Sequence, residues 1–319
     1  MPDPGTMDND VLMTVDGVWR YYGSVCAVKN LGFSLRRGEV VGFLGPNGAG
    51  KTTSMQMLTG VLAVSAGRID IAGHDIIDAA RAARSHIGYL PERPPLYPDL
   101  GVDEYLRYAG RLRGLRGTAL TTALQRCKDR CGLAASGARL IRNLSKGYQQ
   151  RVGIAQAIIH SPALVVLDEP TVGLDPIQIR EIRALIRELG TDHSVILSTH
   201  ILPEVQSVCD RVLIIHQGEL VLDRPLAELA GTTPGLRIGL LRPPAISVLA
   251  AMPGVTRVSG IDANHFYLEH SGGQAFAEQF AAQAVASDWG LTELTPDAES
   301  LENLFIRLTG GEAVTTAAA

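Results

Sequence analysis

Apolar runs alternate with amphipathic stretches along most of the chain, from Val11 to about Asp223. Short apolar runs predict buried strands, and apolar positions that recur every three or four residues predict helices. The predicted strands cover residues 11–15, 40–44, 68–71, 86–90, 163–167, 194–198 and 211–215. The predicted helices cover residues 51–58, 102–112, 119–131, 147–159 and 177–188. Alternating strands and helices of this kind indicate an α/β domain.

A turn-rich joint at residues 231–235 separates this part from a second pattern of elements. The second pattern reads β-α-β-β-α-β, the order of a split-βαβ sandwich, and a short amphipathic helix follows it from about residue 297. Its elements are expected at residues 236–241, 245–251, 255–259, 265–268, 274–286 and 291–294. The predicted organisation is a tail at 1–10, a first domain at 11–230, a small α+β domain at 236–310 and a disordered tail at 311–319.

Composition agrees with two folded domains and excludes a membrane span. The chain has 319 residues, of which 46% are hydrophobic and 19% charged. A bilayer-spanning helix needs about 18 or more consecutive apolar residues. The most apolar stretch, residues 155–167, is interrupted by Gln156, His160, Ser161 and Pro162. The first ten residues also lack the basic and apolar regions of a secretory signal, so we expect a cytoplasmic location.

Charge and cysteine content exclude two further classes of protein. The net charge is -4, and the part from Pro225 onward has four arginines, no lysine and ten acidic residues. Nucleic-acid binding requires a clustered basic face, so we predict no nucleic-acid partner. The four cysteines are too few for a disulfide framework in a chain of this length. Cys127 and Cys131 share one face of a predicted helix and are interpreted as buried thiols.

The sharpest local signal is a glycine-rich segment that fits the pattern G-x-x-x-x-G-K-[ST], between an apolar run and a predicted helix. Glycines let successive backbone N–H groups turn inward around an anion, and the helix N-terminus adds partial positive charge. We expect a nucleoside triphosphate here, with Lys51 at the β- and γ-phosphates and the Thr52 hydroxyl on Mg²⁺. The predicted nucleotide-binding residues of this loop are Gly45, Pro46, Asn47, Gly48, Ala49, Gly50, Lys51, Thr52 and Thr53.

Two acidic residues, Asp168 and Glu169, follow the apolar run at residues 163–167. The carboxyl end of a buried strand is where open α/β sheets place ligands. We expect Asp168 to bind Mg²⁺ together with Thr52, and Glu169 to orient or deprotonate the attacking water. His200 follows the apolar run at residues 194–198, as Asp168 follows its own run. If the two strands are neighbours, the His200 ring should lie near the γ-phosphate.

A second helix start, Leu-Ser-Lys-Gly-Tyr, begins at Leu144. Ser145 and Gly147 suit either a plain helix cap or a second anion site, and the residues alone leave both interpretations open.

With these segments in order, the sequence resembles the nucleotide-binding subunit of an ABC transporter over roughly residues 10–224. The resemblance rests on the Walker A, signature, Walker B and D-loop segments at 45–52, 144–148, 164–169 and 173–176, followed by the switch His200. It implies an α/β P-loop NTPase of the ABC ATPase type. That type has a mixed sheet core, a helical signature subdomain and an N-terminal antiparallel β subdomain, here followed by the small α+β domain.

The resemblance also implies residue roles and a dimer. Tyr22 matches the aromatic residue that stacks on adenine, with Tyr21 as the alternative. Two subunits of the family pack head to tail, so Ser145 and Gly147 of one chain would meet the nucleotide held by Lys51 of the other. The second subunit would be another copy of this chain or a paralogous ATPase.

Two departures from the family pattern stand out. Lys146 and Tyr148 replace the first Gly and the Gln of the usual LSGGQ signature. Glu92 replaces the Gln of the Q-loop, in the sequence Gly-Tyr-Leu-Pro-Glu, where its carboxylate can act as a charged ligand for Mg²⁺.

These variants and the C-terminal domain resemble the ATPases of ABC-2 type exporters, notably the gliding-motility type. The resemblance implies a separate ABC-2 type transmembrane permease and a peripheral position on the cytoplasmic face of the inner membrane. The acidic C-terminal domain is hypothesised to support the dimer or regulate it.

The alternative function is a soluble, non-transport ABC ATPase that acts on a macromolecular complex. Ribosome-acting members resemble two fused copies, whereas this chain has one Walker A and one signature. DNA-repair members insert a long coiled coil between these motifs, and no sustained heptads occur between Lys51 and Ser145. A P-loop kinase or GTPase is disfavoured by the signature.

Overall fold

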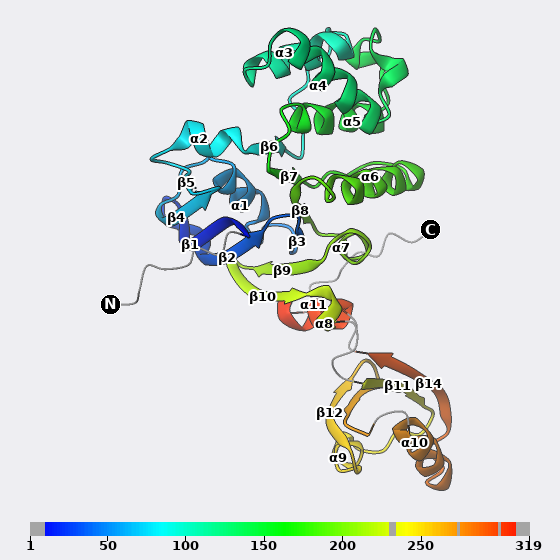
Figure 1. The fold of residues 1–319 in the computed structure, drawn as a ribbon. Coiled ribbons are helices and arrows are strands. Elements are labelled where there is room, and N and C mark those ends of the chain that lie inside the picture. Colours follow the sequence, from blue (N-terminus) through cyan, green and yellow to red (C-terminus); the bar gives the residue numbers. More distant parts are fainter. Residues whose placement is uncertain (1–9, 230–233, 273–274, 299–300, 311–319) are drawn as a thin grey trace. The chain divides into compact units, whose positions relative to one another are not determined.

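The computed structural model describes residues 10–229, 234–272, 275–298 and 301–310 (Figure 1). The predicted tail at 311–319, nearly all of the tail at 1–10 and most of the joint at 231–235 lie outside the described residues. The chain divides into two compact units, residues 1–224 and 225–319.

The first unit is built on a six-stranded sheet in the order β10-β9-β3-β8-β7-β6. Its strands are β3 (Val40–Leu44), β6 (Ile87–Leu90), β7 (Leu164–Asp168), β8 (Ser194–Thr199), β9 (Arg211–His216) and β10 (Glu219–Pro225). The pairs β3–β8, β3–β9, β6–β7 and β7–β8 are parallel. Every residue of β3, β7 and β8 is buried, which explains why these strands appear as continuous apolar runs in the sequence.

A second, antiparallel sheet of the first unit has the order β2-β1-β4-β5. Its strands are β1 (Val11–Tyr22), β2 (Val25–Arg36), β4 (Ala66–Ile71) and β5 (His74–Asp75). The sequence pattern predicted only residues 11–15 and 68–71, and it missed β2 altogether. Several register shifts interrupt the β1–β2 pairing, so apolar and polar residues do not alternate regularly along these strands. The other predicted strands of this unit agree with the structure to within one residue.

The described residues of the first unit form seven α-helices. They are α1 (Lys51–Leu58), α2 (Ala80–Ser85), α3 (Val102–Leu112), α4 (Gly117–Arg130), α5 (Lys146–Ile158), α6 (Pro176–Leu189) and α7 (Leu202–Val208). The five predicted helices agree with the structure to within two residues, whereas the short α2 and α7 were not predicted. No helix in the described ranges has the length and apolar character needed to cross a membrane.

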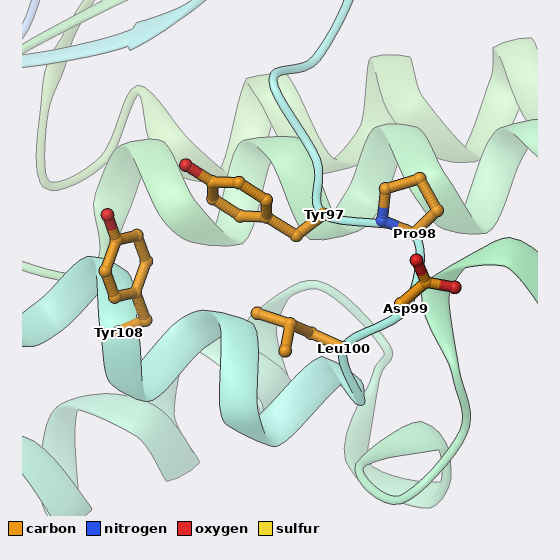
Figure 2. Close-up of a pocket in the computed structure, with 5 residues that line it drawn as sticks. All are labelled: Tyr97, Pro98, Asp99, Leu100 and Tyr108. Carbon is orange, nitrogen blue, oxygen red and sulfur yellow. The ribbon is translucent and has the colours of Figure 1, made fainter.

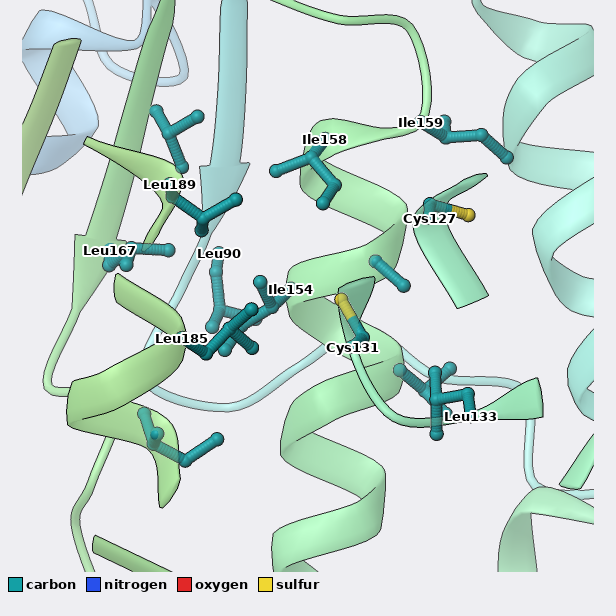
Figure 3. Close-up of a cluster of buried hydrophobic side chains, with 14 of the residues drawn as sticks. Leu90, Cys127, Cys131, Leu133, Ile154, Ile158, Ile159, Leu167, Leu185 and Leu189 are labelled. Carbon is teal, nitrogen blue, oxygen red and sulfur yellow. The ribbon is translucent and has the colours of Figure 1, made fainter. Parts of the chain in front are cut away.

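Helices α3, α4 and α5 lie together as a helical subdomain (Figure 1). Its apolar core continues to the sheet, and Figure 3 shows Cys127 and Cys131 in the same cluster as Leu90 of β6 and Leu167 of β7. Both thiols are buried and free, which confirms their interpretation, and burial raises the pKa of Cys127 to about 12.

The second unit contains the predicted β-α-β-β-α-β order, which the structure confirms. Its elements are β11 (Pro234–Leu240), α9 (Ile246–Ala250), β12 (Val255–Gly260), β13 (His265–His270), α10 (Ala275–Ala286) and β14 (Leu291–Ala298), with α8 (Leu226–Leu229) before them and α11 (Leu301–Thr309) after them. The strands form an antiparallel sheet in the order β12-β13-β11-β14. Leu236, Ile238, Leu268 and Phe280 belong to its separate apolar core.

Candidate functional site

The glycine-rich loop joins β3 to α1 in a backbone conformation that only glycine allows at several positions. Gly48 and Gly50 have φ angles of 80° and 104°. A Cβ atom on Gly45 would lie 2.5 Å from the carbonyl oxygen of Ile215. A Cβ atom on Gly50 would lie 2.7 Å from the carbonyl oxygen of Ala27. The loop is therefore a close-fitting backbone cradle of the kind that surrounds phosphate groups.

Lys51 is the first residue of α1, and its ammonium group is held above this loop. Its Nζ donates hydrogen bonds to the carbonyl oxygens of Gly45 (2.8 Å) and Pro46 (3.2 Å). The same Nζ lies 3.4 Å from Oε1 of Glu169, and both side chains are more than nine-tenths buried. These contacts place one buried positive charge at the mouth of an anion-binding loop.

A pocket of about 410 Å³ collects most of the predicted site residues, a size typical of small-molecule sites. It is lined by Ala27, Asn47, Gly48, Gly50, Lys51, Thr52, Thr53, Glu92, Glu169, Val172 and His200. The sequence pattern missed Ala27 because it missed β2, and the approach of Ala27 to the loop is a tertiary contact that no local pattern signals. The sequence pattern also missed Val172, although this residue lies only three residues after the predicted site residue Glu169.

Asp168 ends β7 with its carboxylate wholly buried. Neither of its side-chain oxygens has a hydrogen-bond partner among the described residues. Burial raises the pKa of Asp168, and the nearby hydroxyls of Ser198 and Thr52 oppose that shift. A buried carboxylate without a partner is costly, and a divalent cation beside Thr52 would neutralise it.

These features fit Mg²⁺ held partly by phosphate. Within the described ranges, no three or more His, Cys, Asp or Glu side chains form a cluster that could hold a metal ion. Mg²⁺ is commonly bound by one or two carboxylates together with substrate phosphates, so a small protein ligand set at Asp168 and Thr52 suits it.

Glu169 and His200 come from the ends of two adjacent strands. Asp168 pairs with Ser198 between β7 and β8, which confirms the expectation that these strand ends are neighbours. Glu169 has a φ of 48°, and its N–H donates to the carbonyl oxygen of Ser198 at 2.9 Å. Nδ1 of His200 lies 2.9 Å from Oε2 of Glu169, and this hydrogen bond raises the pKa of His200. The carboxylate and the imidazole are thus oriented against each other at one wall of the pocket.

Ser145 and Gly147 lie apart from this pocket. Ser145 is the N-cap of α5 and accepts a hydrogen bond from the Tyr148 N–H at 3.4 Å. Gly147 lines a second pocket of about 410 Å³, together with residues that include Tyr148, Arg151 and Asp175. Within one chain, the two predicted anion-binding loops therefore do not share a cavity.

Tyr22 ends β1 with about half of its surface exposed, outside the lining of the nucleotide pocket. The guanidinium of Arg20 lies over its ring, 4.8 Å from the ring centre. Tyr21 instead stacks on Trp19, with the ring centres 6.0 Å apart. The two tyrosine rings therefore have different neighbours, and neither residue is part of the pocket lining.

Comparisons with known proteins agree with this fold. A family model described as "ABC transporter" matches residues 28–172. The linearmycin resistance ATP-binding protein LnrL of Bacillus subtilis is 31% identical over 94% of this chain and 98% of the relative. The Nod factor export ATP-binding protein I of Ralstonia nicotianae is 32% identical over 98% of this chain and 97% of the relative.

A solved structure of cbiO1 from Clostridium perfringens, part of the ABC transporter complex cbiONQ, is similar with a TM-score of 0.63 and 28% identity. The match covers 69% of this chain and 91% of that one. The fold and site therefore define a P-loop ATPase of the ABC type. The chain belongs to the ATP-binding proteins of ABC transporters, which bind and hydrolyse ATP, dimerise and work with transmembrane permease subunits.

Proposed function

We propose that this chain powers export through a separate ABC-2 type permease of the gliding-motility type. The observation that carries the proposal is the pocket in which Lys51, Glu169 and His200 meet at the phosphate loop. Support for export comes from the two relatives that match nearly the whole chain, one named for linearmycin resistance and the other for Nod factor export.

In this proposal, the loop N–H groups and Lys51 bind the phosphates of ATP, and Tyr22 stacks on adenine. Thr52, Asp168 and Glu92 hold Mg²⁺, which neutralises charge on the phosphate oxygens when it is bound. The Glu169 carboxylate orients the attacking water and accepts its proton. His200, held through Nδ1 by Glu169, contacts the γ-phosphate.

Ser145 and Gly147 are proposed to complete the site of a second subunit, either another copy of this chain or a paralogous ATPase. The supporting observation is that Gly147 lines a different pocket of the same chain from the one that Lys51 lines, and that neither Ser145 nor Gly147 lines the pocket of Lys51. A head-to-tail dimer would give each loop a phosphate to bind, so that ATP joins the two subunits.

A groove on the helical subdomain is the proposed permease contact (Figure 2). It has a volume of about 420 Å³ and is lined by Tyr97, Pro98, Asp99, Leu100 and Tyr108. The rings of Tyr97 and Tyr108 meet edge to face, with centres 5.7 Å apart, and both are about half exposed. The segment that lines it, residues 97–100, begins five residues after Glu92 of the nucleotide pocket, and coupling through this segment is part of the proposal. Docking here would place the chain peripherally on the cytoplasmic face of the inner membrane.

Purification of the tagged full chain from its native membranes tests the proposal. We expect a multi-spanning membrane protein of the ABC-2 type to co-purify with it. The double substitution Tyr97→Ala and Tyr108→Ala is expected to lose that protein while nucleotide binding is retained. Val285→Ala, at an exposed position of α10, is the matched control. Recovery of only a ribosomal or other water-soluble complex would contradict the proposal.

The C-terminal domain, residues 236–310, is proposed to support or regulate the dimer. Its own apolar core supports a separate folded module. Removal of residues 232–319 is expected to weaken ATP-dependent self-association in analytical ultracentrifugation. Unchanged self-association together with unchanged ATPase activity would refute this role.

A further inference from the structure

A buried carboxylate on α7 has no role in the site described so far. Glu204 is 1% exposed and lies in a helix whose other buried residues, Leu202, Val205 and Val208, are apolar. Burial of a charged side chain costs several kcal/mol unless hydrogen bonds and opposite charges compensate for it. Its compensating partners therefore indicate what the carboxylate holds in place.

One oxygen of Glu204 supports the segment that carries His200. Thr199 Oγ1 donates to Oε2 of Glu204 at 2.8 Å. The same Oγ1 accepts a hydrogen bond from the Ile201 N–H at 3.0 Å. The residues on either side of His200 are thus joined by one hydroxyl, and Glu204 anchors that hydroxyl.

The other oxygen supports the segment that follows Glu169. The hydroxyl of Thr171 donates a short hydrogen bond to Oε1 of Glu204, and Thr171 is itself 1% exposed. The next residue, Val172, donates its N–H to the carbonyl oxygen of Glu169 at 3.3 Å and lines the nucleotide pocket. A guanidinium nitrogen of Arg183 on α6 lies 3.5 Å from Oε1, so a positive charge offsets the buried carboxylate.

We propose that Glu204 is a positioning residue for ATP hydrolysis. Its two oxygens join the chain segments that present Glu169 and His200, and thereby maintain the contact of 2.9 Å between those two side chains. Glu204 does not line the nucleotide pocket and so acts through its neighbours. The inference rests on the proposed roles of Glu169 and His200.

The arrangement separates hydrolysis from binding. Phosphate binding depends on the loop and on Lys51, none of which contacts Glu204 through a hydrogen bond in the structure. Hydrolysis depends on the alignment of Glu169, and a misplacement of about 1 Å in an active site can lower the rate by about 100-fold. Loss of the Glu204 hydrogen bonds should therefore reduce the rate constant of hydrolysis and leave nucleotide affinity nearly unchanged.

The test uses the full chain and two measurements, single-turnover hydrolysis of radiolabelled ATP and equilibrium binding of a fluorescent ATP analogue. We expect Glu204→Gln, Thr171→Val and Thr199→Val each to slow hydrolysis by about 10- to 100-fold, with affinity within about twofold of wild type. Thr171→Ser and Thr199→Ser retain the hydroxyl and should restore most of the rate. The double variant of Glu204→Gln with Thr199→Val should be no slower than the slower single variant, because both remove the same link.

Thr309→Val is the matched control, because Thr309 is a buried threonine of the second unit whose hydroxyl donates to the Phe305 carbonyl oxygen at 2.8 Å. Its hydrolysis rate should equal that of wild type. A wild-type rate in Glu204→Gln, or a rate that falls together with nucleotide affinity, would overturn the inference. If Glu204→Gln does not fold, a wild-type hydrolysis rate in both Thr171→Val and Thr199→Val would overturn the inference instead. A wild-type rate in Glu169→Gln would instead overturn the proposed role of Glu169, on which the inference rests.

Discussion

The ammonium nitrogen of Lys51 lies 3.4 Å from Oε1 of Glu169, and both side chains are almost completely buried. The cation predicted to bind phosphate thus faces the carboxylate predicted to act on water. A triphosphate in the loop competes with Glu169 for this ammonium group. If Glu169 has its proposed role, nucleotide binding and the freedom of its carboxylate are linked through a single ion pair.

Replacement of Lys51 by alanine should remove most of the affinity for ATP. A hydrogen bond to a charged group contributes about 1.5–3 kcal/mol, and loss of the buried cation also leaves Glu169 without its opposite charge, so we expect a loss of ~100-fold or more. Equilibrium binding of a fluorescent ATP analogue measures the effect. Lys29→Ala, which breaks a partly exposed ion pair with Glu219, is the control and should bind normally.

Glu169→Gln should keep nucleotide binding and lose hydrolysis. The amide retains the size of the side chain but cannot accept the proton of water, and general-base catalysis contributes about 100- to 10,000-fold in rate. We expect an ATP-dependent dimer that persists during size-exclusion chromatography. Glu188→Gln, at an exposed position near the end of α6, should hydrolyse ATP at the wild-type rate. Wild-type turnover in Glu169→Gln would show that another group activates the water.

Glu92→Gln should raise the Mg²⁺ concentration needed for half-maximal ATPase activity. Glu92 lines the nucleotide pocket, and its negative charge contributes to the raised pKa of Asp168, so loss of this charge should weaken the attraction for a cation bound at Asp168. An amide is a weaker ligand for Mg²⁺ than a carboxylate. A Mg²⁺ titration of the ATPase rate measures the change, with Glu219→Gln as the control at an exposed position. Identical titration curves for wild type and Glu92→Gln would show that Glu92 is not a ligand of Mg²⁺.

His160 should make the protein less stable as the pH falls. Burial lowers the pKa of His160 from 6.5 to about 4, and its Nε2 is bonded to the Ile87 carbonyl oxygen at 3.1 Å. Between these two pH values the unfolded imidazole binds a proton that the folded one does not. The free energy of unfolding therefore decreases as the pH falls through this range, by about 3 kcal/mol at most.

Urea unfolding of wild type and His160→Gln at pH 7, 5.5 and 4.5 measures this dependence. The variant has no imidazole at this position, so its stability should decrease less steeply between pH 6.5 and 4. If the free energy of unfolding decreases equally with falling pH in wild type and in His160→Gln, groups other than His160 cause the acid sensitivity.

Local sequence was sufficient for the parts of the site that consecutive residues form. The segment from Gly45 to Thr52 has its backbone determined by its own glycines and by the helix that begins at Lys51. Asp168 and Glu169 were found because a buried strand ends at them, and the order of elements in the second unit followed from its apolar pattern. In each case, nearest neighbours in the chain decide the conformation.

Tertiary structure decided the contacts between distant segments. The β1–β2 hairpin escaped prediction because its register shifts break the apolar alternation. The buried carboxylate of Glu204 has no sequence pattern of its own, and its distant partner Thr171 reaches it only when β7 and β8 pair. The ion pair of Lys51 with Glu169 depends on the same sheet. The sequence by itself thus determined which chemical groups are present, and the register of the parallel sheet decided which of them meet.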